Sequence, residues 1–229
     1  MRGTRLAPPL LGLGLAFTLT ACTEGGLSGL FGGTTQLAVR DGAVIVRGPQ
    51  NFCIDDTASN SAGGFAVLAG CNVIAYRGPA PAHPALITVQ VGEEGSATVT
   101  GAEEVMAEFL SSDDGVLLLS VAGDATTVDI EEVQHSDGLV EVRFSDTSAP
   151  VPDGLQTGEW RAFLDVADRL VTIRIRSLAH APLLPQEGAV LLRQTVAQIQ
   201  AANPVARPSE NEPDAPEAPE PATARASAG

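Results

Sequence analysis

Hydrophobic and polar residues alternate with a period of two along several short stretches of this chain, the pattern of strands with one buried face. The clearest case is a predicted hairpin over residues 160–176, with a turn at Ala167-Asp168. The side chains predicted to share the buried face are Trp160, Ala162, Leu164, Val166, Val171, Ile173 and Ile175. Trp160 would then be a core residue rather than an aromatic binding residue, and Arg174 and Arg176 would point away from the core.

Other segments show similar strand patterns. Two further hairpins are predicted. The first pairs 36–40 with 43–47 around a type I′ turn at Asp41-Gly42, and the second pairs 127–133 with 139–144 around Asp137-Gly138. A half-buried strand is predicted at 86–91. Apolar segments at 51–54 and 65–76 flank a polar loop. Val116–Val121 is almost continuously apolar, which predicts a central strand covered on both faces.

Two segments have helical spacing instead. Thr100-Gly101-Ala102-Glu103 is a capping box, which predicts a three-turn helix ending before Asp113. Pro185 suits the first position of a second helix, which ends at Asn203-Pro204. The predicted fold class is therefore α+β, an antiparallel sheet with about two packed helices, an arrangement that includes the α/β/α sandwich.

The two ends of the chain differ from the middle. Residues 1–21 have the basic start, apolar centre and small final residues of a signal peptide. Residues 22–35 are rich in Gly and predict a flexible tether, and residues 203–229 are rich in Pro, Ala and Glu and predict a disordered tail. One folded domain is expected over 36–202.

Leu19-Thr20-Ala21-Cys22 resembles the lipobox of bacterial lipoproteins. The resemblance implies diacylglycerol on the Cys22 thiol, cleavage before Cys22 and anchoring in a membrane through the lipid. Thr23, in place of Asp, implies an outer-membrane location facing the periplasm in a Gram-negative host. The alternatives are an ordinary secretory signal that ends by chance in a cysteine, or a single membrane-spanning anchor.

With Cys22 assigned to the lipid, Cys53 and Cys71 remain. An oxidising compartment outside the cytoplasm favours a disulfide between them. The alternatives are two free thiols or two ligands of a metal site. His83, His135 and His180 do not have the spacing that would complete a metal site, and each is expected to be exposed.

Charge and composition restrict the functions to consider. The formal net charge of −15 disfavours nucleic acid as a partner. The chain contains no Lys, which excludes a P-loop lysine and Schiff-base chemistry. No G-x-S-x-G motif and no cofactor motif are present, so we predict no enzyme and no cofactor.

Two groups of residues are candidate binding sites. Asp55 and Asp56 begin a polar loop whose oxygens could hold Ca²⁺, although its spacing is not that of an EF-hand and a solvated turn explains it as well. Arg143, Arg174 and Arg176 could form a basic patch that binds a carboxylate or phosphate. Pairing with neighbouring acids is the alternative for these arginines.

The runs NFCID at 51–55, GGFAVLAGC at 63–71 and WRAF at 160–163 resemble a group of uncharacterised alphaproteobacterial lipoproteins. The order of hairpins and terminal helix is also similar to the Mog1/PsbP-like sandwich, which implies no function by itself. The leading hypothesis is a non-enzymatic envelope lipoprotein that contacts another envelope protein. A binder of a small molecule or ion, and a hydrolase without a recognisable motif, are the other two hypotheses.

Overall fold

The computed structural model describes residues 33–148 and 153–204 of the 229-residue chain. The predicted features that lie outside these residues are the signal peptide (1–21), Cys22, residues 23–32 of the tether and residues 205–229 of the tail. Within the described ranges, no helix combines the length and the apolar character that crossing a membrane requires.

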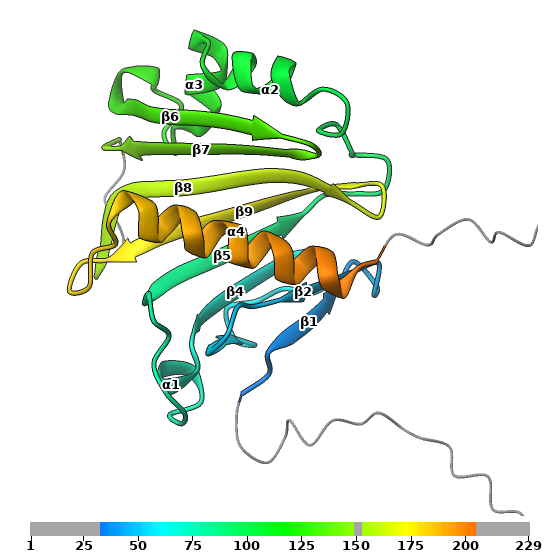
Figure 1. Ribbon diagram of the computed structural model, residues 1–229, viewed down its shortest axis with the longest axis vertical. Coiled ribbons are helices and arrows are strands. Elements are labelled where there is room, and N and C mark those ends of the chain that lie inside the picture. The colour runs from blue at the N-terminus through cyan, green and yellow to red at the C-terminus, as the bar shows by residue number, and fades with distance from the viewer. Residues whose placement is uncertain (1–32, 149–152, 205–229) are drawn as a thin grey trace, which may run out of the picture.

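Seven antiparallel strands form the central sheet, in the spatial order β3-β4-β5-β9-β8-β7-β6 (Figure 1). The strands are β3 (Phe52–Ile54), β4 (Phe65–Gly70), β5 (Ala85–Val91), β6 (Val128–Ser136), β7 (Leu139–Asp146), β8 (Leu155–Val166) and β9 (Arg169–Leu178). Most neighbours are consecutive in the chain, and the pairing of β5 with β9 joins the two halves of the sheet. The predicted α+β class with an antiparallel sheet is confirmed.

Helix α4 (Pro185–Ala202) covers one face of the sheet (Figure 1). Its buried Leu191, Leu192, Val196 and Ile199 join the apolar residues of β4, β5, β8 and β9 in one core. Trp160 belongs to this core, as predicted, and its indole N–H donates to the carbonyl of Pro185 at 3.2 Å. Pro185 is the first residue of the helix, as expected from its fixed φ.

A separate hairpin of β1 (Gln36–Val39) and β2 (Val44–Arg47) completes the layer on the α4 side. Asn203, the residue at which α4 ends, fixes the hairpin, because its side chain exchanges two hydrogen bonds of 2.8 Å with the backbone of Ile45. The hairpin is confirmed, but the two-residue turn at Asp41-Gly42 is wrong. Val39 pairs with Val44, so four residues form the connection.

Helices α2 (Glu103–Leu110) and α3 (Asp113–Leu119) lie on the other side, over β6 and β7 (Figure 1). The predicted strand at 116–121 is therefore wrong. The Ser112 hydroxyl accepts a hydrogen bond from the backbone N–H of Gly115, which caps α3, and two acids follow in its first turn. Helix α2 is confirmed, but Glu103 accepts from the N–H groups of Gly101 and Gly138 instead of forming the predicted box with Thr100.

The buried apolar face of the sheet changes side between β8 and β7. Apolar residues of β8 such as Ala162 and Leu164 face α4, whereas Val142 and Phe144 of β7 pack with residues of α2 and α3. Phe163, which alternates with Ala162 and Leu164, joins the second core. The result is three layers, with α4 and the small hairpin on one side of the sheet and α2 and α3 on the other.

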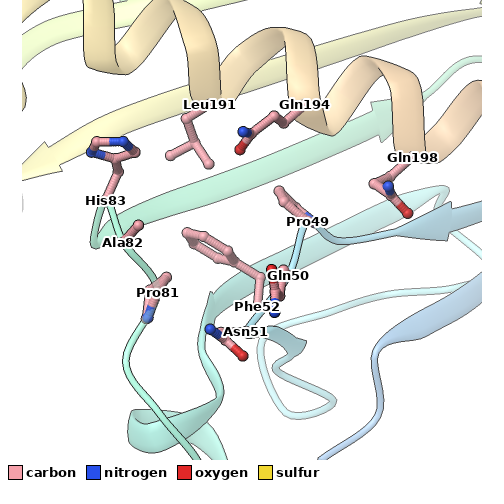
Figure 2. A pocket seen from close by; sticks show the side chains of 10 residues that line it. All are labelled: Pro49, Gln50, Asn51, Phe52, Pro81, Ala82, His83, Leu191, Gln194 and Gln198. Carbon is pink, nitrogen blue, oxygen red and sulfur yellow. The ribbon is translucent and has the colours of Figure 1, made fainter.

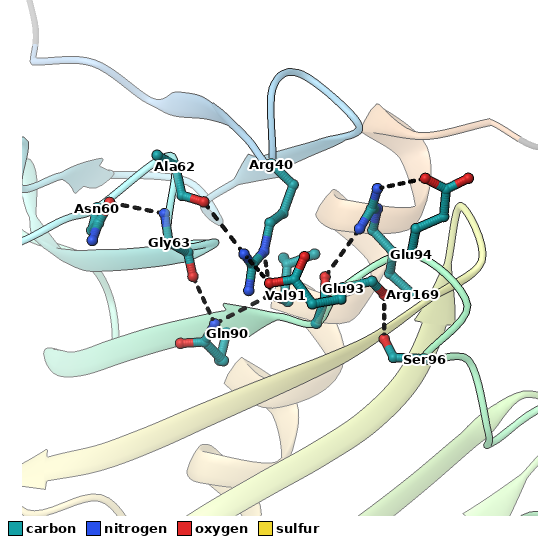
Figure 3. Close-up of polar contacts among 11 residues, drawn as sticks. Arg40, Asn60, Ala62, Gly63, Gln90, Val91, Glu93, Glu94, Ser96 and Arg169 are labelled. Atoms are coloured by element: carbon teal, nitrogen blue, oxygen red, sulfur yellow. Dashed lines mark hydrogen bonds and ion pairs between the residues drawn. The ribbon is translucent and has the colours of Figure 1, made fainter.

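Two arginines clamp one end of the sheet (Figure 3). Arg40, in the β1–β2 connection, pairs with Glu93 at 2.6 Å and donates to the carbonyl of Val91 at 3.0 Å. Arg169, at the start of β9, donates to the carbonyl of Gly92 at 3.3 Å and lies 3.8 Å from Glu94. The loop after β5 is thereby tied to both the hairpin and β9.

Two short helical segments complete the described chain. Helix α1 (Cys71–Ile74) follows β4 directly, and a 3₁₀ turn, η2 (Ala125–Thr127), leads into β6. Asp146, at the end of β7, ties this turn to the end of α3, because its carboxylate accepts from the Thr127 hydroxyl and the Val121 N–H. Burial acts to raise the pKa of Asp146, but its hydrogen bonds prevail and lower the pKa to about 2.

Candidate functional site

Glu159 on β8 is fully buried and is surrounded by three arginines, a group we call the arginine cluster. The pairing of β8 with β9 explains its composition, because Glu159 is opposite Arg176 and Arg161 is opposite Arg174. All four side chains lie on the face away from α4. They alternate along β8 and β9 with Trp160 and Ile175, whose side chains belong to the core under α4.

The two carboxylate oxygens of Glu159 are fully used by these arginines. Oε1 accepts from Arg161 Nε at 2.7 Å and from Arg174 Nε at 2.8 Å. Oε2 accepts from Arg174 Nη2 at 2.8 Å and from Arg176 Nε at 3.0 Å. Arg161 also stacks over the Phe144 ring, 4.9 Å from its centroid. Bidentate and stacked contacts of this kind hold the guanidinium planes in fixed orientations.

The electrostatics keep Glu159 ionised. Burial of the carboxyl acts to raise its pKa, but the hydrogen bond from Arg174 and the charges of Arg161, Arg174 and Arg176 outweigh burial and lower the pKa to about 2. Burial lowers the pKa of Arg161, whereas the hydrogen bond to Glu159 raises the pKa of Arg174. The guanidinium groups stay charged at neutral pH, so three positive charges surround one negative charge.

The predicted patch of Arg143, Arg174 and Arg176 is only partly brought together. Arg174 and Arg176 meet on Glu159, but Arg143 lies on the opposite face, where it is paired with Trp160 across the strands and bridges to Glu131. The expectation that all three share one face is therefore wrong. The cause is the change of buried face between β8 and β7, which single-strand alternation does not reveal.

Sequence reasoning also missed Glu159 and Arg161. A signal for both was present, because the predicted turn at Ala167-Asp168 sets the register of the β8–β9 hairpin. Both turn residues have positive φ, 50° and 58°, and Val166 pairs with Arg169 on either side of them. Counting back from this turn places Arg161 opposite Arg174 and Glu159 opposite Arg176.

Cys53 and Cys71 lie together at the edge of the sheet. Their sulfur atoms are 2.07 Å apart, which is bonding distance, and their Cα atoms are 4.8 Å apart. Cys53 is in β3 and Cys71 begins α1. The two segments that flank the polar loop thus meet as the sequence predicts.

The polar loop itself is built on Asp55. Its carboxylate accepts from the Thr57 hydroxyl at 2.7 Å and from the backbone N–H groups of Thr57 and Ala58. The Thr57 hydroxyl is the largest contribution to a lowered pKa of Asp55, followed by the Ala58 N–H. Asp55 therefore forms a turn within its own loop. In residues 33–148 and 153–204, no group of three His, Cys, Asp or Glu side chains is placed to hold a metal ion.

A cavity of about 340 Å³ opens on the α4 side of the sheet, between α4 and the loops at 49–51 and 81–83 (Figure 2). Its walls combine apolar residues such as Phe52 and Leu191 with carboxamides from the loops and the helix. The carboxamides belong to Gln50, Asn51, Gln194 and Gln198. His83 lies at its rim, and its Nδ1 is 3.9 Å from a carboxylate oxygen of Glu187.

The outward surface of α2 and α3 exposes large apolar side chains. We call this the α2–α3 surface and define it by Val105, Phe109, Leu117, Leu118 and Val121. Val105 and Leu118 are each 68% exposed. Exposed acids accompany them on the same helices and the following loop, namely Glu104, Glu108, Asp113, Asp114 and Asp124. Large apolar side chains that are exposed beside polar neighbours on two packed helices are typical of protein interaction sites.

No protein-family model matches this chain, and no curated protein matches it. The solved structures that match include a mutant of the protein Mog1, 15% identical with a TM-score of 0.41, covering 73% of this chain and 93% of that chain. They also include the Saccharomyces cerevisiae Ran-binding protein Mog1p, 14% identical with a TM-score of 0.41, covering 73% of this chain and 92% of that chain. The similarity to Mog1 is weak and concerns the fold alone.

Proposed function

We propose that this chain is a bacterial envelope lipoprotein, anchored through lipid on Cys22, whose folded domain binds another envelope protein and catalyses no reaction. The α2–α3 surface is the observation that carries the proposal. A folded domain gains stability by burying large apolar side chains, yet four of them are exposed on two short helices and a fifth, Val121, is exposed just after α3. Such exposure is typical of a surface that is covered by a binding partner.

The charges around the α2–α3 surface define the partner. Acidic side chains such as Glu104, Glu108 and Asp114 are exposed on the same helices. The complementary partner is a protein surface with an apolar centre and a rim of Lys or Arg. These acids also argue against an anionic bilayer as the occupant, because like charges repel.

The lipoprotein part of the proposal rests on the resemblance of Leu19-Thr20-Ala21-Cys22 to a lipobox. The pairing of Cys53 with Cys71 across the polar loop supports export to an oxidising compartment, because disulfides persist there. Replacing Cys22 with Ser should abolish labelling by radioactive palmitate and release the protein from the membrane fraction. Continued labelling, or unchanged sedimentation with membranes, would contradict the lipid anchor.

The protein-binding part is tested by placing a photoreactive amino acid at Leu118 in the native envelope. We expect one crosslinked product of defined mass, lost when Val105 is replaced with Asp and weakened by salt. The matched control is the same amino acid at Gln200, an exposed position of α4. Equal crosslinking at both positions, a product that contains only a second copy of this chain, or crosslinking to lipid would each overturn the proposed partner.

A further inference from the structure

The arginine cluster carries more positive charge than its position requires. Elsewhere in the described chain, four arginines pair with one acid each: Arg40 with Glu93, Arg143 with Glu131, Arg169 with Glu94 and Arg193 with Glu141. Glu159 instead holds Arg161, Arg174 and Arg176. Three guanidinium groups and one carboxylate leave a local charge of about plus two in a strongly acidic protein. Both oxygens of Glu159 already accept at least two hydrogen bonds each, so this carboxylate has little capacity for further donors.

The outer edges of two arginines remain accessible. The side chain of Arg174 is 37% exposed and that of Arg176 is 16% exposed. In the described part of the chain, Arg174 Nη1 and both Nη atoms of Arg176 donate to no other residue. Helices α2 and α3 pack over β6 and β7, on the same side of the sheet but beyond the two strands that carry the cluster.

A hydroxyl group stands beside these guanidinium groups. Thr88 on β5 is directly opposite Arg174 on β9, so its side chain lies on the same face and in the neighbouring strand. Directly opposite side chains in antiparallel strands have Cβ atoms about 5 Å apart. An oxyanion above Arg174 is therefore within reach of the Thr88 hydroxyl as well.

We propose that Arg174, Arg176 and Thr88 bind a dianionic phosphate group, with Glu159 and Arg161 holding the two binding guanidinium groups in place. A phosphate monoester carries close to two negative charges at neutral pH and has three strong acceptor oxygens. This matches both the local charge and the three donor groups. Since Glu159 fixes the guanidinium planes before the ligand arrives, little side-chain entropy is lost on binding.

The charge balance distinguishes phosphate from a single carboxylate, which would neutralise only half of the excess. The site also lies on a different surface from the α2–α3 surface and needs no lipid on Cys22. The proposal therefore stands or fails independently of the proposed function.

The test is a titration of the isotopically labelled full-length chain, in mild nonionic detergent, with inorganic phosphate at constant ionic strength. The Nε–H resonances of Arg174 and Arg176 should shift and saturate, whereas chloride should leave them unchanged. Arg176→Gln should weaken phosphate binding at least tenfold, and Thr88→Val severalfold. Arg193→Gln, which removes an exposed arginine on α4, is the control and should change nothing.

Each variant must keep the fold, which the unchanged backbone spectrum verifies. Thr88→Val leaves all hydrogen bonds to Glu159 intact, so it tests the site even if Arg176→Gln disturbs the strand. Vesicles that carry phosphatidic acid, compared with vesicles of phosphatidylcholine alone, distinguish a lipid headgroup from a soluble phosphate. Shifts that never saturate, shifts equal to those of Arg193, or tighter binding of succinate than of phosphate would overturn the proposal.

Discussion

The two sides of the sheet are covered to very different extents. On the α4 side, 22 buried residues form one continuous core that spans β3 to β8. On the other side, a core of eight residues lies under α2 and α3 at the β6–β7 end. The middle of that second side is occupied by the arginine cluster instead of a helix.

This difference separates stability from interaction. The α4 side removes apolar surface from water over five of the seven strands, and it therefore dominates the hydrophobic stabilisation of the domain. The second side keeps its charged residues in the middle and its large apolar residues on the outer surface of α2 and α3. Changes on the first side should alter folding, and changes on the second side should mostly alter binding.

Glu159→Gln is the exception that tests this separation most strongly, because Glu159 is the one fully buried carboxylate of the arginine cluster. Removing one partner from a buried ionic group costs about 4 kcal/mol at neutral pH, since the other charges remain buried without compensation. Urea unfolding of the variant at pH 7 should show this loss. A loss below about 1 kcal/mol would mean that solvent screens the three arginines well enough without the carboxylate of Glu159.

Glu159 should also make the stability of the native protein depend on pH in a way that the Glu159→Gln variant does not. The pKa of Glu159 is lowered from 4.5 to about 2 in the folded protein, so its stabilisation is complete above pH 4.5 and is lost as the pH falls toward 2. The corresponding free energy is about 3 kcal/mol. Between pH 5 and pH 2, the native protein should lose this much more stability than Glu159→Gln does, and parallel curves would contradict the assignment.

The Cys53–Cys71 pair stabilises the edge of the sheet without adding to either core. Because the bond constrains the unfolded chain between residues separated by 18 positions, replacing both with Ala should lower the free energy of unfolding by about 3 kcal/mol. The Asp55–Gly64 loop should also become more sensitive to protease. Mass spectrometry of the unreduced, alkylated protein checks the bridge directly, and alkylation of both cysteines under denaturing conditions would rule it out.

The strands and α4 could be predicted because their signals are local. Alternation defines each strand, and the turn at Ala167-Asp168 defines the register of the longest hairpin. The layer against which a strand packs is not a local property, which is why alternation alone groups Arg143 with Arg174 although they lie on opposite faces of the sheet. Alternation in β7 is the same whether Val142 faces α4 or α2.

The segment 116–121 shows the second limit of local patterns. A short apolar run fits a buried strand and a buried helix equally well. Ser112 and the two acids after it distinguish them, because they cap a helix and favour its positive end. Of the candidate site, Arg174 and Arg176 could be predicted from alternation alone. Their position opposite Arg161 and Glu159 requires the further step of counting back from the turn between β8 and β9.

Gly188→Ala should weaken the larger core. Replacing a helical glycine with alanine normally raises the free energy of unfolding by up to about 1 kcal/mol. A Cβ at Gly188 would overlap the indole ring of Trp160, however, and overpacking of this kind costs about 3 kcal/mol. We expect the free energy of unfolding to fall by about 2 kcal/mol. Unfolding can be measured by the fluorescence of Trp160, the one tryptophan of the chain. A stabilised variant would show that α4 can shift outward at no cost.

Gly115→Ala should have the smallest global effect and the most localised one. A Cβ there would overlap the carbonyl group of Phe109, so α3 must move away from α2. Because these helices cover only the smaller core, we expect a global loss of about 1 kcal/mol. Backbone amides of α2 and α3 should exchange with solvent faster, while those of β4, β5 and β9 keep their protection. Gly158→Ala is the matched control, since a Cβ at Gly158 meets no atom within 4 Å. Equal loss of protection across the whole sheet would show that the two cores unfold as one unit. The two sides of the sheet would then differ in packing and binding but not in their local unfolding.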